Sequence, residues 1–282
     1  MNDTSDPETA GAPAPSDALL DVTRTGDVVV VTMVYRPYNL IGPKLLGALS
    51  SALSSAVAAR ARAVVIRSAL RHFSAGADLD LFESRTSPPP ADGARAPRSG
   101  RPSVGAVEFL KTLETAPVPI IASVHGVCLG GGFELALACD YIVAAASAKI
   151  GSVEATLGLH PLMGAVQRLA HRAGMARAKE MAMLARRYDA ATLERWGVVN
   201  LVVADDDLES TTLAIAKEFA SGPTVAHAAT KALAYVAANE GVRAADEAMA
   251  ELQRPIWASE DLKTGLASFR RAGPGHARFE GR

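Results

Sequence analysis

The chain has 282 residues, enough for a large buried core, and hydrophobic residues make up 49% of it while aromatic residues make up only 5%. Its 29 basic and 30 acidic residues give a net charge of -1, so no global field would attract a polyanion. Few aromatic side chains are available as platforms on which bases could stack. Composition therefore argues against a nucleic-acid partner and favours a small molecule.

The sequence supports neither a metal site nor membrane insertion. Cys128 and Cys139 lie in an apolar stretch, which predicts buried free thiols, and the six histidines are scattered without metal-ligand spacing. No run approaches the roughly 18 uninterrupted apolar residues that a membrane span needs. Residues 1–20 are acidic and rich in Pro and Ala, and they lack the basic start and apolar core of a signal peptide. We expect a disordered tail on a cytoplasmic protein.

Hydrophobic periodicity predicts alternating strands and helices in the first half of the chain. Residues 28–34 are rich in β-branched side chains and predict a strand, and leucines four apart within residues 44–60 predict a helix. Residues 63–68 predict a second strand, which completes a βαβ unit with a parallel pair. Two further strands are expected at residues 117–126 and 141–146, with a helix beginning at the intervening Gly131.

The C-terminal third is predicted to be mainly helical. Apolar residues recur at helical spacing in four segments, namely residues 176–184, 206–220, 224–239 and 242–257. A short apolar segment, residues 197–203, predicts a last strand. Residues 84–103 are rich in Pro, Gly, Ser and Arg and predict a mobile surface loop. We therefore expect an α/β core over residues 21–204 and a helical oligomerisation region over residues 205–282.

Two glycine-bearing turns follow predicted strands. They are residues 72–78, HFSAGAD, and residues 126–134, GVCLGGGFE. Glycine lets backbone N–H groups face a ligand, and a helix N-terminus adds partial positive charge. Two such turns at the carboxyl ends of neighbouring strands could aim two donors at one oxygen, which predicts an oxyanion hole. Taken singly, either turn could instead serve only tight turning and close packing of helix against sheet.

Nucleotide binding is the main alternative for the triple glycine, Gly130 to Gly132. Its spacing does not match the GxGxxG pattern of dinucleotide-binding turns, and the chain has no GxxxxGK[ST] phosphate loop. Both nucleotide hypotheses are therefore excluded.

Two glutamates lie beside the predicted oxyanion hole. Glu134 falls in the first turn of the helix that the triple glycine opens, and Glu154 falls in the connection after the next strand. Glu134 could merely complement the helix dipole, and Glu154 could be solvated. Their shared position at the strand ends indicates instead an acid/base pair that manages the proton and the water of an addition reaction.

The combination of motifs resembles the enoyl-CoA hydratase/isomerase family, the crotonase superfamily. The resemblance covers nearly the whole chain after about Asp21. The motifs that carry it are Phe73 to Asp78, Gly130 to Asp140, Glu154, Gly158 to Leu169 and Phe279 to Arg282. The resemblance implies an α/β fold made of a spiral of repeated ββα units with a C-terminal helical layer. It also implies a homotrimer or a dimer of trimers.

The resemblance implies a role for individual residues. Ala77 and Gly131 would supply the oxyanion-hole N–H groups, and Glu134 and Glu154 would be the catalytic pair. The positions implied to contact substrate are Ser74, Ala75, Gly76, Asp78, Gly130 and Leu162. By their own sequence context, Asp78 and Asp140 are better explained as capping or turn residues, and His125 as a packed turn residue.

The implied substrate is an acyl-CoA thioester, with no cofactor other than the coenzyme A that the substrate carries. Both glutamates are present, so the resemblance favours an enoyl-CoA hydratase of fatty acid metabolism over an isomerase or decarboxylase of the same family. A non-catalytic scaffold with the same fold is a third hypothesis, which the neutral charge and intact glutamates disfavour. The family's usual Pro-Gly-Ala-Gly-Gly segment is here Pro161 to Ala165, PLMGA, which would reshape the acyl pocket.

Overall fold

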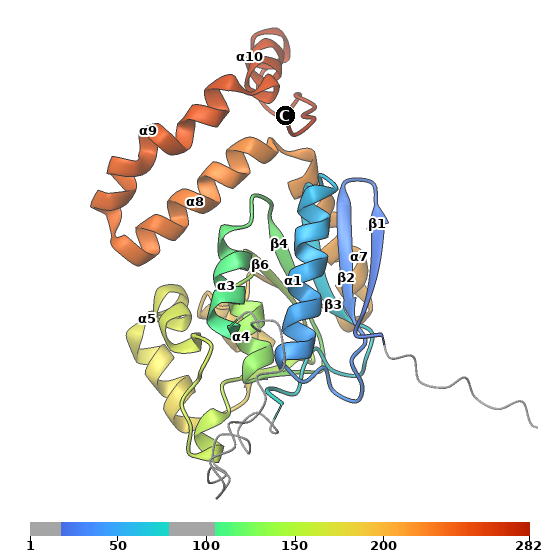
Figure 1. Ribbon diagram of the computed structural model, residues 1–282, viewed down its shortest axis with the longest axis vertical. Helices are drawn as coiled ribbons and strands as arrows, with labels where there is room; N and C mark the ends of the chain where they lie inside the picture. Colours follow the sequence, from blue (N-terminus) through green and yellow to red (C-terminus); the bar gives the residue numbers. More distant parts are fainter. Residues whose placement is uncertain (1–17, 79–104) are drawn as a thin grey trace, which may run out of the picture.

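The computed structural model describes residues 18–78 and 105–282, and a six-stranded sheet lies at its centre (Figure 1). Neighbouring strands follow the order β1 (Leu20–Thr25), β2 (Val28–Met33), β3 (Ala63–Ser68), β4 (Ile120–Val124), β6 (Tyr141–Ala145) and β9 (Leu201–Val203). β1 pairs with β2 in antiparallel fashion, and the other neighbours are parallel. The fully buried, β-branched sequence of β2 is typical of a strand covered on both faces.

A smaller sheet lies beyond the carboxyl ends of the central strands. It contains β5 (Val127–Leu129), β7 (Lys149–Gly151) and β8 (Tyr188–Asp189), and β5 and β7 are parallel. The chain passes from β4 to β5 and then into α4 (Gly131–Leu137), and it repeats this path through β6, β7 and α5 (Ala165–Leu184). These repeated ββα units confirm the predicted α/β fold class.

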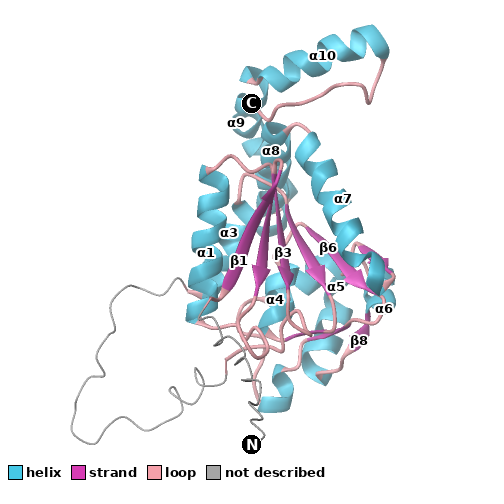
Figure 2. Ribbon diagram, turned by 90° about the vertical axis from the view of Figure 1, so that its right-hand side faces the viewer, coloured by secondary structure: helices cyan, strands magenta, loops and turns pink. Residues whose placement is uncertain are grey.

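Helices cover both faces of the central sheet. In Figure 2, α1 (Pro43–Ala58) and α3 (Ala106–Thr115) lie on one side and α7 (Leu208–Ser221) on the other. Leucines at positions 45, 49 and 53 of α1 are buried, as the four-residue spacing predicted. The C-terminal helices α8 (Thr224–Glu240), α9 (Val242–Ala258) and α10 (Glu260–Ala272) extend away from the sheet (Figure 1). The short helices are α6 (Ala190–Arg195), η1 (Glu154–Leu157) and η2 (Asp205–Asp207).

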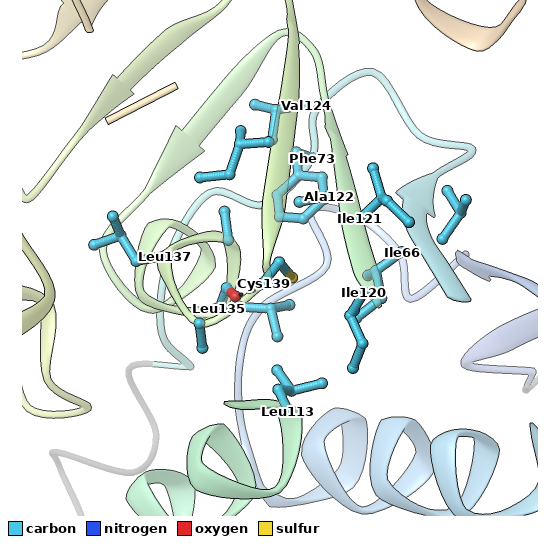
Figure 3. Close-up of a cluster of buried hydrophobic side chains, with 14 of the residues drawn as sticks. Ile66, Phe73, Leu113, Ile120, Ile121, Ala122, Val124, Leu135, Leu137 and Cys139 are labelled. Carbon is cyan, nitrogen blue, oxygen red and sulfur yellow. Dashed lines mark hydrogen bonds between the residues drawn. The ribbon is translucent and has the colours of Figure 1, made fainter. Parts of the chain in front are cut away.

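The main hydrophobic core is continuous through the sheet and reaches the candidate site. Figure 3 shows Ile120, Ile121 and Ala122 of β4 packed among side chains that include Leu135 of α4 and Phe73 of the first glycine-bearing turn. Phe73 is completely buried. Burial of a side chain of this size contributes on the order of 2–3 kcal/mol. The turn is therefore anchored in the core by the residue that precedes Ser74.

The predicted strands and helices are present, but several boundaries differ. The last strand begins only at Leu201, and α5 begins at Ala165, eleven residues before the predicted helix of residues 176–184. A break at Gly174, with φ 82° and ψ 161°, separates the two parts of α5, which is why periodicity indicated only the second. β1, α3, β5, β7, β8, α6 and α10 were not predicted.

The structure does not test the predicted tail, the predicted loop or the predicted division of the chain. The loop of residues 84–103 lies outside them, as does the tail of residues 1–20 except for its last three positions. The division at residues 204 and 205 also stays a prediction. The structure shows that α7 packs on the sheet and that its Ala216 and Ala220 belong to the main core. No helix in the described ranges is long and apolar enough to cross a membrane.

Candidate active site

The structure brings the two glycine-bearing turns into direct contact. Ser74 forms a parallel bridge with Cys128, in which Ser74 N–H donates to Val127 O (3.2 Å) and Leu129 N–H donates to Ser74 O (3.1 Å). A Cβ atom added to Gly130 would lie 3.6 Å from the Cα atom of Gly76. The two turns follow β3 and β4, which are adjacent parallel strands, so their contact agrees with the reasoning from the sequence.

The backbone around Ala77 and Gly131 leaves both N–H groups available. Ile41 N–H donates to Gly76 O (2.8 Å), and Asp78 N–H donates to Ile41 O (3.0 Å). This parallel bridge turns the N–H of Ala77 to the side away from Ile41. Gly131 is the first residue of α4, so its N–H has no acceptor within the helix. Within residues 18–78 and 105–282, neither N–H donates a hydrogen bond.

Glu134 is buried and linked to the start of α5. Its side chain is 2% exposed, and its Oε1 accepts hydrogen bonds from Met163 N–H (2.8 Å) and Ala165 N–H (3.0 Å). Gly164, between them, has φ 112°, a conformation that favours glycine. Glu134 is therefore more than a partner of its own helix dipole, because it also satisfies backbone donors at the N-terminus of the following long helix.

Glu154 opens η1 and faces the second turn. Its Oε2 accepts a hydrogen bond from the hydroxyl of the buried Ser152 (2.7 Å). Its Oε1 is buried, and in the described part of the chain it has no hydrogen-bond partner. A Cβ atom added to Gly130 would lie 3.3 Å from this oxygen. The unpaired oxygen therefore lies against the turn that carries Gly131.

The two carboxyl groups interact electrostatically. Burial raises the pKa of Glu134, and the charge of Glu154 raises it further, while N–H groups from Ala165 and Met163 oppose the rise. The raised pKa means that Glu134 holds a proton more readily than an isolated glutamate, while Glu154 offers the unpaired Oε1 as an acceptor. The arrangement can therefore hold one acid and one base next to the same turn.

The residues predicted to contact substrate differ in accessibility. Ser74 is completely buried, and its hydroxyl donates to Asn39 O (2.8 Å). Gly76 and Gly130 are also buried and have φ values of 123° and 49°, whereas Leu162 is 39% exposed. Ala75 and Asp78 are intermediate in exposure. The site residues are thus close together along the two turns, and their contacts with substrate stay predictions.

The remaining polar candidates have structural contacts. Asp140 accepts a hydrogen bond from Ile120 N–H (2.7 Å) and pairs with Lys231 (2.6 Å), at the end of the sheet opposite the glycine-bearing turns. His125 contacts Leu70 O through Nε2 (2.7 Å), which agrees with a packed turn residue. Cys128 and Cys139 are buried free thiols, as predicted. The described ranges contain no group of three or more side chains suited to hold a metal ion.

Reasoning from the sequence missed three residues near the site, namely Asn39, Ile41 and Ser152. Asn39 adopts φ 51° and is completely buried, and Ile41 contacts both turns. The sequence contained one usable signal, because asparagine is enriched among non-glycine residues with positive φ. The contacts of Ile41 depend on segments far apart in the chain and carry no local signal.

Comparisons with known proteins agree with this architecture. The family model described as enoyl-CoA hydratase/isomerase matches residues 23–280. A protein named probable enoyl-CoA hydratase, from Rhizobium meliloti (strain 1021), is 35% identical over 258 residues, which are 88% of this chain and 93% of that protein. Carnitinyl-CoA dehydratase from Salmonella enteritidis PT4 (strain P125109) is 32% identical over 256 residues, which are 89% and 94% of the two chains.

Solved structures show the same likeness. The crystal structure of enoyl-CoA hydratase from Bacillus anthracis aligns with a TM-score of 0.81 and 28% sequence identity, and the alignment covers 94% of this chain and 100% of that chain. The two sheets and the paired glycine-bearing turns define an α/β protein with the crotonase fold. The chain belongs to the enoyl-CoA hydratase/isomerase family.

Proposed function

We propose that this protein is an enoyl-CoA hydratase that adds water across the α,β double bond of an enoyl thioester. The N–H groups of Ala77 and Gly131 would hold the thioester oxygen, and Glu134 and Glu154 would handle the protons. The observation that carries the proposal is the buried, unpaired Oε1 of Glu154, in the described ranges, next to the turn of Gly131. An acceptor in such a place is suited to take a proton from a bound water molecule.

The two glutamates and the two N–H groups can carry out every step of the hydration. Glu154 Oε1 takes a proton from water as the hydroxyl oxygen bonds to the β-carbon, and the π electrons move through the α-carbon onto the thioester oxygen. The two N–H groups stabilise this oxyanion, and each such donor typically lowers the barrier by about 3–4 kcal/mol. The α-carbon then takes a proton from Glu134, whose raised pKa favours the protonated form. Transfer of a proton between the carboxyl groups restores the starting state.

Substitution of Glu154 by Gln tests the proposal. The purified variant should hydrate crotonyl-CoA with a kcat about 10² to 10⁴ times lower than the native protein, because a positioned general base contributes a factor of that size. The loss of enoyl absorbance measures the rate. Glu218→Gln, on the exposed side of α7, is a matched control and should retain native activity. Full activity of Glu154→Gln would contradict the proposal.

Product analysis with other thioesters and a binding measurement separate the other hypotheses. An isomerase or a decarboxylase of the family would use the same oxyanion hole with different proton delivery. Product analysis on a 3-enoyl-CoA and on a malonyl-type thioester would detect either activity. A non-catalytic scaffold would give no product, and titration calorimetry with acetyl-CoA would then show no binding.

The assembly and the location belong to the same proposal. We expect a homotrimer or a dimer of trimers, formed through the C-terminal helices. Large apolar side chains are exposed on α9 and α10, among them Trp257 (70% exposed) and Phe269 (59% exposed), which supports a role in association. Light scattering measures the mass in solution, and a monomer would contradict this part. We also expect the protein in the cytoplasm, which cell fractionation would test.

A further inference from the structure

The segment of residues 38–41 lies along the first glycine-bearing turn and is hydrogen-bonded to it at several points. Ala75 N–H donates to Tyr38 O (3.1 Å), and the Ser74 hydroxyl donates to Asn39 O (2.8 Å). Ile41 accepts from Asp78 N–H and donates to Gly76 O, as described above. The segment thus fixes the backbone on both sides of Ala77, whose own N–H points away from it.

Asn39 holds this segment against the end of β3. Its Nδ2 donates to the Ser68 hydroxyl (2.8 Å) and to Phe73 O (3.1 Å). The Ser68 hydroxyl in turn donates to His72 O (2.7 Å). All three contacts are buried or partly buried, where the loss of a partner leaves a polar group unsatisfied. Asn39 therefore connects the last residue of β3 to the first residues of the turn.

Ser74 connects the first turn to the second. Its hydroxyl accepts a hydrogen bond from Gly76 N–H (3.3 Å), and its backbone pairs with β5. Its Cβ atom occupies the space beside Gly132, where an added Cβ would come within 2.4 Å of it. Ser74 is therefore in contact with the residue that directly follows Gly131.

Ile41 contacts the same pair of turns from the other side. A Cβ atom added to Gly131 would lie 3.1 Å from the Cβ atom of Ile41. The segment of residues 38–41 therefore touches Gly131 through a side chain and borders Ala77 through its backbone. The segment is hydrogen-bonded to the first turn on both sides of Ala77 but only packs against Gly131, so a displacement of the segment would move the N–H of Ala77 relative to that of Gly131.

We infer that Asn39 and Ser74 are positioning residues that set the separation of the Ala77 and Gly131 N–H groups for a thioester oxygen. The inference rests on the proposed function. Neither side chain needs to touch substrate, since both act through the backbone of the first turn. Misplacement of a reacting or binding group by about 1 Å can cost on the order of 10² in rate. Loss of one hydrogen bond in this network should displace the turn by less and cost about tenfold in kcat.

Ser74→Ala is the main test, with a spectroscopic readout on the bound carbonyl. Butyryl-CoA labelled with ¹³C at the thioester carbonyl cannot be hydrated, and its infrared stretching frequency falls when the oxygen accepts hydrogen bonds. Binding to the native protein should lower the frequency, and binding to Ser74→Ala should lower it less. With crotonyl-CoA, the variant should lose about tenfold in kcat with KM within about twofold of native.

A matched control separates positioning from general destabilisation. Ser123 is a buried serine in β4 whose hydroxyl pairs with the Thr212 hydroxyl (3.1 Å), on the α7 face of the sheet. Ser123→Ala loses a similar buried hydrogen bond and should keep the native carbonyl shift and kcat. Asn39→Gly is a second variant, because glycine tolerates φ 51° and the side chain with its amide is removed without backbone strain. It should behave as Ser74→Ala does.

The outcomes are distinct. A reduced carbonyl shift and a reduced kcat in both site variants, with native values in the control, would support the inference. A native carbonyl shift in Ser74→Ala and Asn39→Gly would overturn it while leaving the proposed function intact. No carbonyl shift in the native protein itself would overturn the proposed function, and the inference with it.

Discussion

Substitution of Gly132 by Ala tests the close contact between the two glycine-bearing turns. The new Cβ would lie 2.4 Å from the Cβ and 2.6 Å from the Oγ of Ser74. Carbon atoms in contact are normally about 3.5–4.0 Å apart, so the turns must separate by about 1 Å. A displacement of this size should lower kcat by about 10², because the two N–H groups would no longer match one oxygen.

The effect of Gly132→Ala on stability should be smaller than its effect on rate. Overpacking costs about 1–3 kcal/mol, and alanine in a helix offsets about 1 kcal/mol of that. We therefore expect a loss of at most about 2 kcal/mol, measured by urea unfolding. Gly47→Ala in α1 is the control, since its added Cβ would meet no atom within 4 Å apart from neighbouring backbone of its own helix, and it should stabilise by about 1 kcal/mol with native kcat. Native kcat in Gly132→Ala would refute the reasoning.

Three further predictions concern groups around the site and the core. Because the pKa of Glu134 is raised in the folded protein, its contribution to stability is complete at low pH and is lost as pH rises through that pKa. At neutral pH, Glu134→Gln should therefore unfold at a higher urea concentration than the native protein, and the difference should vanish near about pH 4. Arg168→Ala should cost on the order of 3 kcal/mol in thermal or urea unfolding, because it leaves the largely buried Glu114 without its bidentate partner. Burial raises the pKa of Cys139 to about 12 and that of Cys128 well above its usual range, so a thiol reagent at about pH 8 should react with both only after denaturant is added; rapid reaction in the native state would contradict this.

The central strands could be predicted because their own residues determine them. β3 was predicted with its observed ends, since Ala63 to Ile66 is apolar and mostly β-branched, with Arg62 before it and Arg67 and Ser68 after it. β7 and β8 could not be predicted in this way. They have three and two residues, and they exist because Ile150 pairs with Cys128 on one side and with Tyr188 on the other. Such strands are determined by distant partners and show no period of their own.

The helix α3 was missed although its sequence carries a signal. Phe109, Leu110 and Leu113 are buried at helical spacing. The residue before the helix is Gly105, so no side-chain cap marks its start. α10 was missed for another reason. It is rich in charged residues, and only Asp261 and Ser268 are buried in it, so its sequence has a polar average.

The candidate site shows the same division between local and distant information. The neighbouring positions of the two turns could be predicted, because parallel strands β3 and β4 place their carboxyl ends together. The contact of Glu134 with Met163 and Ala165 could not be predicted, since it spans about thirty residues and depends on the turn at Gly164. The role of Asn39 depends in the same way on Ser68 and Phe73.

The attachment of Glu134 to the start of α5 has a consequence for protein engineering. The N–H groups of Ala165, Met163 and Gly164 lower the pKa of this carboxyl against the effect of burial. A library that varies residues 161–165 to admit new acyl chains would therefore also alter the acidity of Glu134. Variants with a wider substrate range should differ in the pH at which they turn over fastest, and a screen at a single pH would discard some of them.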